Sequence, residues 1–212
     1  MDDATVERSN RILAELRGCV DTLDGERQRL AALSMTLVVG IGRLRIGIVH
    51  GDAESLAGWR FAHDALDAAG ARSWLELVRA ASCIDVFAST HTCLPTVREF
   101  SLDAGRLTVI NNGAAGMPNF RGTTFGVITR IGRSRSPHQP LCRVEHDGVF
   151  IEALPVHYDQ SRWLYDFSED WPAGSSAYES YFPRLVGGPA FSLDDAVGRV
   201  TAGATNVREL TP

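Results

Sequence analysis

Residues 45–52 read RIGIVHGD, an apolar run that stops at His50, Gly51 and Asp52. The run is short, rich in isoleucine and nearly free of charge, which is typical of a β-strand buried on both faces. In open α/β sheets, ligands bind just beyond the carboxyl ends of the strands. The stretch therefore predicts an α/β fold with a functional site at this strand end.

The same pattern occurs twice more along the chain. A second apolar strand, residues 84–88, is followed by STHTCLP at 89–95, and a third, residues 107–110, is followed by NNG at 111–113. Upstream, residues 36–39 and 44–49 are apolar, β-branched and separated by glycines, which predicts a hairpin. Because carboxyl ends of parallel strands share one edge, we expect the three polar clusters to converge.

Periodicity predicts the remaining elements. Helical spacing of apolar residues occurs in residues 4–17, 26–33, 55–81 with a break near Gly70, 161–170 and 178–182. Residues 125–131 and 149–156 alternate in character and are expected to be antiparallel strands, with an exposed connection at 132–140. We expect three parts: a helical N-terminal segment (1–34), a sheet core (35–157), and a C-terminal helical cap and tail (158–212).

Composition excludes several classes of function. The chain has 212 residues and a net charge of −5, and no apolar run approaches the roughly 20 residues of a membrane-spanning helix. Its 21 basic residues are all arginines, scattered along a chain of pI about 5.7, which argues against a nucleic-acid surface. The polar, acidic start resembles no signal or transit peptide, and the four cysteines form no CxxC pair. We therefore expect a cytoplasmic protein with reduced thiols.

Five polar residues at the strand ends are the candidates for a site. His50 and His91 suit metal ligation, although hydrogen-bonded strand-end histidines are the simpler interpretation. Cys93 is a candidate ligand, a small buried apolar residue or, less readily, a nucleophile. Asp52 could accept a hydrogen bond from a ligand or cap a helix beginning near Ser55. Asn112 could contact a phosphate oxygen or adopt a left-handed turn.

The order of these clusters resembles the metallophosphoesterase family, also called calcineurin-like phosphoesterases. Four stretches carry the resemblance: RIGIVHGD (45–52), DVFASTHTCLP (85–95), LTVINNGAAGMPN (107–119) and FGVITRI (125–131). In that family one strand ends in a metal-binding His-Gly, matched here by His50, and a later strand ends in Gly-His-Thr-His. Thr90, His91, Thr92 and Cys93 align with the latter without gaps.

The resemblance implies a fold and a site. The fold would be part of a metallophosphoesterase-like αββα sandwich with a mixed sheet. The metal ligands would be His50, His91 and Cys93, and Asp52 and Asn112 would meet the substrate. The cofactors would be divalent manganese, iron or zinc, although a thiolate at position 93 suits manganese poorly. The family's carboxylate-bearing motifs precede these stretches and do not occur before residue 45, so its N-terminal βαβ units are expected to be missing.

Two functions follow as expectations. The first is a metal-dependent phosphoester hydrolase, a phosphatase acting on a phosphorylated small molecule or other phosphoester, in a truncated or incomplete chain. The alternative is a catalytically inactive domain derived from that family, with a binding or structural role. In either case an unpaired sheet edge and uncovered apolar faces favour self-association of the chain. No membrane or nucleic-acid partner is expected.

Overall fold

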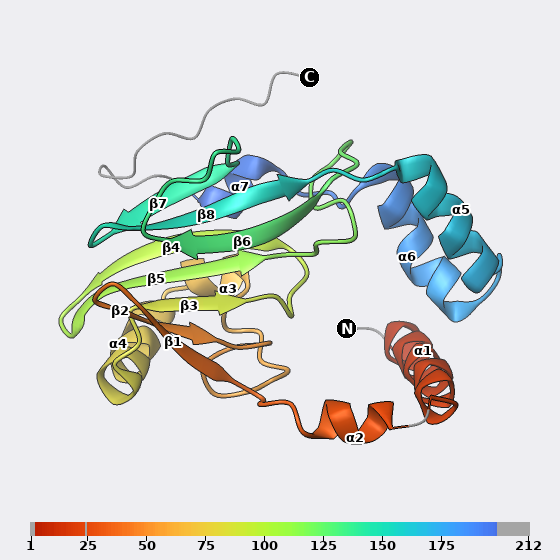
Figure 1. Ribbon diagram of the computed structural model, residues 1–212, viewed down its shortest axis with the longest axis horizontal. Helices are drawn as coiled ribbons and strands as arrows, with labels where there is room; N and C mark the ends of the chain where they lie inside the picture. Colours follow the sequence, from red (N-terminus) through yellow and green to blue (C-terminus); the bar gives the residue numbers. More distant parts are fainter. Residues whose placement is uncertain (1–2, 24, 199–212) are drawn as a thin grey trace. The chain divides into compact units, whose positions relative to one another are not determined.

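The computed structural model describes residues 3–23 and 25–198, which fall into two units (Figure 1). One unit is helical and comprises residues 1–34 and 158–187; the other comprises 35–157 and 188–212 and contains every described strand. Residues 199–212 of the expected C-terminal cap and tail (158–212) lie outside the described residues.

The larger unit is built on a five-stranded mixed sheet. Its strands are β1 (Leu37–Ile41), β2 (Leu44–Ile48), β3 (Val86–Ser89), β4 (Pro95–Leu102) and β5 (Gly105–Asn112). They lie in the order β1-β2-β3-β5-β4. The central strands β2, β3 and β5 are parallel, and β1 and β4 run antiparallel at the two edges. The carboxyl ends of the three parallel strands therefore share one edge, as the sequence predicts.

The β1–β2 hairpin closes with a two-residue turn. Ile41 pairs with Leu44, which leaves Gly42 and Arg43 in the turn. Gly42 has a φ of 62°, in the left-handed region that a glycine occupies without steric cost. Type II′ hairpin turns place a glycine at this first position. The glycine thus fixes the register of the hairpin.

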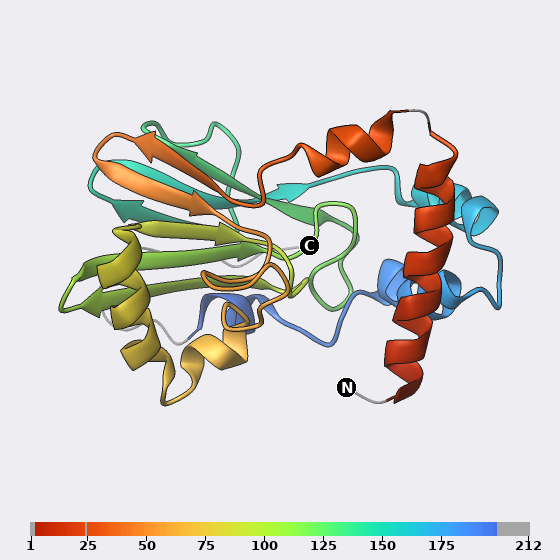
Figure 2. The same cartoon turned by 90° about the horizontal axis from the view of Figure 1, so that it is seen from below.

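Two helices cover one face of this sheet, α3 (His63–Asp67) and α4 (Ala71–Ser82), as Figure 2 shows. α4 presents Leu75 and Val78 to the sheet, and both are buried. They join an apolar cluster that includes Phe61, Phe87 and Val109. Burial of each such side chain stabilises the fold by about 1.5–3 kcal/mol.

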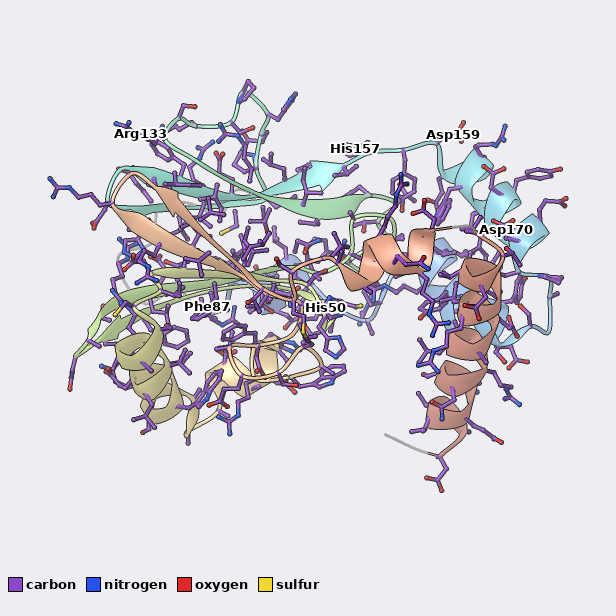
Figure 3. All side chains as sticks on the ribbon, turned by 60° about the horizontal axis from the view of Figure 1, so that its bottom comes forward. His50, Phe87, Arg133, His157, Asp159 and Asp170 are labelled. Carbon is purple, nitrogen blue, oxygen red and sulfur yellow. The ribbon has the colours of Figure 1, made fainter. Side chains whose placement is uncertain are left out.

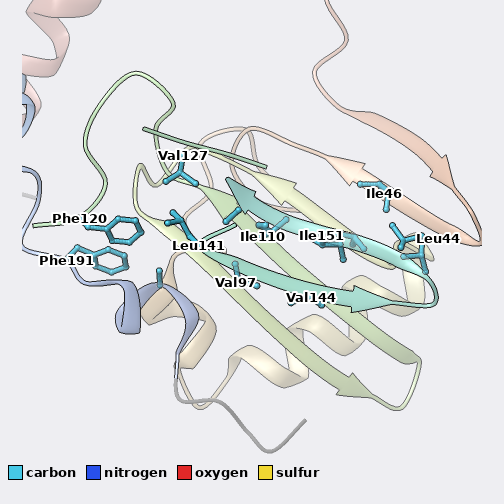
Figure 4. Close-up of a cluster of buried hydrophobic side chains, with 14 residues drawn as sticks. Leu44, Ile46, Val97, Ile110, Phe120, Val127, Leu141, Val144, Ile151 and Phe191 are labelled. Carbon is cyan, nitrogen blue, oxygen red and sulfur yellow. The ribbon is translucent and has the colours of Figure 1, made fainter. Parts of the chain in front are cut away.

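A second sheet packs on the opposite face. Its strands β6 (Gly126–Gly132), β7 (Cys142–His146) and β8 (Val149–Val156) lie in the order β6-β8-β7, and all pairs are antiparallel. Between the sheets lies the main core, drawn in Figure 4, where Ile46 and Ile110 of the first sheet meet Ile151 of the second. The unit is therefore an α/β sandwich of helices, a mixed sheet and a second sheet.

The short helix α7 (Leu193–Val197) packs on β4. Arg98 of β4 donates hydrogen bonds to the backbone carbonyl oxygens of Ala196 and Asp195, and its guanidinium also forms a two-pronged ion pair with Asp67. The Arg98 side chain is only 10% exposed, but that of Asp67 is 54% exposed, so water still screens the charge of this pair.

The helical unit contains α1 (Asp3–Asp21), α2 (Glu26–Ala31), α5 (Gln160–Asp170) and α6 (Ser176–Gly187). Phe167 of α5 packs against Tyr178 and Phe182 of α6. The Gln160 side chain donates to the carbonyl oxygen of Leu185. None of the described helices is long and apolar enough to cross a membrane.

The structure confirms most of the predicted elements and corrects four. The antiparallel pairing of residues 125–131 with 149–156 is confirmed. Strands β4 and β7 and helix α7 were not predicted, and the helix expected from residue 55 begins only at His63. β4 begins at Pro95 and contains Arg98 and Glu99, so it lacks the apolar run of a central strand; an edge position tolerates both features.

Candidate functional site

The parallel pairing of β2 and β3 sets two histidines side by side. Ile48 pairs with Ala88, so His50 and His91 both follow the last paired residues at the same edge of the sheet. Figure 3 labels His50 at this strand end. The His50 carbonyl oxygen accepts hydrogen bonds from the backbone N–H groups of Thr90, at 3.2 Å, and His91, at 2.8 Å. The backbone therefore locks the two loops together.

The two imidazoles meet directly. His91 Nδ1 lies 3.1 Å from His50 Nε2, with the ring centroids 4.9 Å apart in an edge-on arrangement. The expected closeness of these two side chains is confirmed. Such a contact has two chemical interpretations: a hydrogen bond between one protonated and one unprotonated nitrogen, or two lone pairs directed at a shared cation.

The nitrogen separation fits ligation of a single metal ion. With metal–nitrogen bonds of about 2.0–2.1 Å, two neighbouring ligands lie roughly 2.8–3.4 Å apart in octahedral to tetrahedral geometry. The observed 3.1 Å falls within this range. Neutral imidazole nitrogens suit zinc and iron as ligands, whereas manganese prefers oxygen ligands.

The surroundings of His91 favour its neutral form. Burial lowers its pKa, the neighbouring His50 lowers it further, and Asp52 acts in the opposite direction. The Trp59 ring stands edge-on to the His91 imidazole, with centroids 5.4 Å apart. At neutral pH the ring is therefore available as a lone-pair donor rather than as a cation.

Cys93 lies on the same loop, two residues after His91. Its thiol is exposed and donates to the carbonyl oxygen of His91 at 3.4 Å, and its backbone has a φ of 56°, unusual for a residue with a side chain. Across residues 3–23 and 25–198, no three His, Cys, Asp or Glu side chains are grouped so as to hold a metal ion. Ligation by Cys93 stays a prediction.

Asp52 organises the loop that follows β2. Its buried carboxylate accepts hydrogen bonds from the backbone N–H groups of Glu54, Ser55 and Arg60, at 2.9, 3.0 and 3.1 Å. The Asp52 carboxylate accepts from backbone N–H groups as a helix-capping aspartate does, but here these groups belong to a loop, because no helix begins at Ser55. Contact of Asp52 with a substrate stays a prediction.

The third strand end is shaped by asparagines. Asn112 is the last residue of β5 and donates to the carbonyl oxygen of Val127; the left-handed position belongs to Gly113, with a φ of 69°. The fully buried Asn111 donates to Thr92 and accepts from the Gly113 N–H. Contact of Asn112 with a phosphate oxygen stays a prediction.

Sequence reasoning did not single out Asn111, Thr92 or Asn119, yet these residues hold the loops. Asn119 is fully buried, accepts from the backbone N–H of Ala114 and donates to its carbonyl oxygen. Thr90 donates to the carbonyl oxygen of Gly113, which ties the loop after β3 to the loop after β5. All three lie in stretches that carry the family resemblance, Thr92 in 85–95 and Asn111 and Asn119 in 107–119.

No family model and no curated protein matches the sequence. Several solved structures match the fold, among them the following two. A hypothetical protein from Pyrococcus horikoshii is 18% identical, with a TM-score of 0.52 over 81% of this chain and 57% of its own. A metallophosphoesterase from Sphaerobacter thermophilus is also 18% identical, with a TM-score of 0.50 over 79% of this chain and 65% of its own.

These similarities establish the fold. The chain has a metallophosphoesterase-like α/β sandwich, as the resemblance of its strand ends implied. It spans 57% and 65% of the lengths of the two structures that it matches.

Proposed function

We propose that His50 and His91 bind one divalent metal ion in a site for phosphoester hydrolysis. The observation that carries this proposal is the 3.1 Å separation of two imidazole nitrogens at the carboxyl ends of adjacent parallel strands. The metallophosphoesterase-like fold supports it. The proposed metals are manganese, iron or zinc, and the proposed substrate is a phosphorylated small molecule or another phosphoester.

The bound metal would activate water and neutralise charge on the phosphoester, which is the chemistry that such ions supply in hydrolases. The protein's part is to hold the two ligands in place. The hydrogen bonds from Thr90 and His91 to the His50 carbonyl oxygen fix the spacing of the two backbones. Asp52 fixes the following loop, which carries Trp59 to the edge of the His91 ring.

Two imidazoles alone make a weak site, because catalytic metal sites generally have three or more protein ligands. We therefore propose that further ligands come from outside the described residues, with Cys93 as a candidate third ligand. The proposal also includes substrate contacts by Asp52 and Asn112, and a cytoplasmic location.

The second candidate function is a non-catalytic domain on the same fold. The observation that favours it is the donor set, which contains only a pair of histidines in the described part of the chain. In this proposal the His50–His91 contact is a structural hydrogen bond that holds two loops together, and no metal is needed.

Metal titration separates the two candidates. Calorimetry with Zn²⁺ or Mn²⁺ is expected to show binding that His91→Ala weakens at least tenfold, while the matched variant of the exposed His138, His138→Ala, leaves it unchanged. Hydrolysis of p-nitrophenyl phosphate and its bis-ester is then followed with the same metals. Equal metal affinity in the wild type and His91→Ala favours the non-catalytic domain.

Turnover tests the completeness of the site. The 212-residue chain is expected to hydrolyse either ester at no more than a trace rate. Robust metal-dependent turnover that His91→Ala abolishes would contradict the need for outside ligands, and would place the missing ones among residues to which we assign structural roles.

A further inference from the structure

Trp59 is an exposed aromatic residue beside the histidine pair. It is 52% exposed, although tryptophan is a residue that folded proteins bury in large part. Its ring centroid lies 5.4 Å from that of His91, at an interplanar angle of 72°. Because a T-shaped contact covers at most one face of the indole, much of the ring stays open to solvent next to the two imidazoles.

The loop around Trp59 is held firmly. The Arg60 N–H donates to the buried Asp52 carboxylate at 3.1 Å. The Trp59 carbonyl oxygen accepts from the Ala62 N–H at 3.0 Å, and the Phe61 side chain between them is completely buried. An anchored loop thus presents the indole to solvent, and a ring that is already in place costs a ligand little conformational entropy to bind.

The nearby Trp74 shows how this part of the fold uses a tryptophan for packing. Its ring centroid lies 5.7 Å from that of Phe61, and the Arg60 guanidinium carbon lies 4.7 Å from it. In the described part of the chain, the aromatic ring that contacts Trp59 is that of His91. Core packing therefore does not account for Trp59, and its place beside a proposed metal ligand indicates a contact with the molecule bound there.

We propose that Trp59 binds a planar aromatic group of the phosphoester substrate by stacking. This inference rests on the proposed function, since the histidine pair has to hold the phosphate for its ester group to lie next to the indole. Two kinds of substrate share this chemistry: a nucleotide, whose base would stack, and an aryl phosphate, whose ring is bonded to the phosphate oxygen. In both, Trp59 is a specificity residue and takes no part in bond breaking.

The charges near the indole favour a neutral ring over a charged group. Arg60 pairs with Glu54 at 3.4 Å, and its guanidinium also lies on the Trp74 ring. The Asp52 carboxylate accepts from three backbone N–H groups. Each of the three charged side chains in residues 52–60 therefore has a partner. A flat, neutral group is the chemistry that remains for the indole to recognise.

An aliphatic ester group would also cover the indole, but it would gain only from the burial of apolar surface. A flat aromatic ring adds the attraction between two π systems and lies against the indole over a whole face. Stacking of a base on an aromatic side chain changes affinity by roughly five- to hundredfold. Pairs of phosphates that differ in such a ring therefore test the proposal.

The test is calorimetry of the full chain at a saturating Zn²⁺ concentration with two pairs of phosphates. AMP is compared with ribose 5-phosphate, which lacks the base, and phenyl phosphate with cyclohexyl phosphate, whose ring is saturated. At least one aromatic member is expected to bind about fivefold or more tightly than its counterpart. A larger affinity ratio for the AMP pair identifies a nucleotide, and a larger ratio for the phenyl pair identifies an aryl ester. This comparison needs no variant, so it does not depend on how a variant folds.

Trp59→Ala is expected to reduce that affinity ratio to less than about twofold, and Trp59→Phe to keep most of it, because a smaller aromatic ring still stacks. Trp163→Ala is the matched control and should keep the full ratio, since Trp163 is 38% exposed on α5 of the helical unit. Ratios near one for both pairs, in a wild type that binds Zn²⁺, would overturn this inference and leave the proposed function standing. A ratio that survives Trp59→Ala would overturn it too, and a wild type that binds no Zn²⁺ would overturn both.

Discussion

Arg143 Nε donates to Glu152 Oε1 at 2.7 Å, and the Glu152 side chain is completely buried. Arg130 pairs with the other carboxylate oxygen at 2.7 Å, and the backbone N–H of Ser136 donates to both oxygens. Burial raises the pKa of Glu152, but these donors outweigh it and bring the pKa below its usual value. The loop expected to be an exposed connection is thus anchored at Ser136.

Glu152→Gln is expected to lower the free energy of unfolding by about 1–3 kcal/mol, because it leaves Arg130 and Arg143 without their counter-charge. Since the native pKa is lowered, the carboxylate stabilises the fold above the unfolded value of about 4.3 and loses this effect as pH falls further. Urea unfolding at pH 7 and pH 4 measures both effects. The exposed Glu145 on β7 provides the control, and an equal loss in Glu145→Gln would contradict the prediction.

His146 gives a second titration of the same sign, in a higher pH range. It is 3% exposed between the sheets, with Nδ1 3.4 Å from Thr108 Oγ1, and burial followed by the charge of Arg106 lowers its pKa. The native state therefore favours the neutral ring, and stability is complete above the unfolded pKa of about 6.5 and falls as pH drops below it.

We expect His146→Asn to flatten the fall in unfolding free energy between pH 7.5 and 5.5. Denaturant titrations across this range measure the slope, and NMR titration of the imidazole locates its pKa directly. His91 contributes a slope of the same sign, so its signal is followed in parallel. If the unfolding free energy of His146→Asn falls with pH as steeply as that of the control variant His138→Asn, then His146 does not cause the slope and the prediction is wrong.

The convergence of His50 and His91 could be predicted from sequence because a simple rule governs it. Apolar strands that each end in a polar cluster place those clusters at one edge when the strands are parallel. The structure shows this for β2 and β3. The 3.1 Å nitrogen separation lay beyond that reasoning, since it depends on backbone hydrogen bonds between two loops.

The loops themselves could not be predicted. Asp52 holds residues 54–60 through three backbone N–H groups, an arrangement with no periodicity to reveal it. Strand β4 was missed for a related reason: its position at an edge admits Pro95 and two charged residues that a central strand would exclude. Side chains whose role depends on loop shape leave only a weak pattern in the sequence.

Cysteine reactivity offers a third prediction. Burial, and secondarily the charge of Glu99, raises the pKa of the Cys142 thiol to about 11, whereas Cys19, Cys83 and Cys93 are exposed. Because the thiolate is the reactive form, iodoacetamide at pH 8 is expected to alkylate the three exposed cysteines and spare Cys142. Peptide mass spectrometry measures the extent of alkylation at each cysteine. In urea all four should react, and early labelling of Cys142 in the native protein would contradict its burial.

Gly58 provides the last prediction, which links the Asp52 loop to the histidine pair. A Cβ at this position would lie 1.9 Å from Asp52 Oδ2, and that carboxylate cannot move aside without losing its backbone hydrogen bonds. Gly58→Ala is therefore expected to cost about 1–3 kcal/mol of stability, as the loss of buried hydrogen bonds does. Urea unfolding measures this, with Gly116→Ala as the matched control because nothing lies within 4 Å of its Cβ.

The same variant tests whether the loop positions the site. Trp59 directly follows Gly58 and contacts the His91 ring, so loss of the Asp52 hydrogen bonds should release the indole from the imidazole. Trp59 fluorescence and the His91 NMR signal are expected to shift in Gly58→Ala and to stay unchanged in Gly116→Ala. If the loop stiffens the metal ligands, Gly58→Ala should also weaken Zn²⁺ binding several-fold. Unchanged His91 signals in a destabilised Gly58→Ala protein would show that the loop supports the fold without positioning His91.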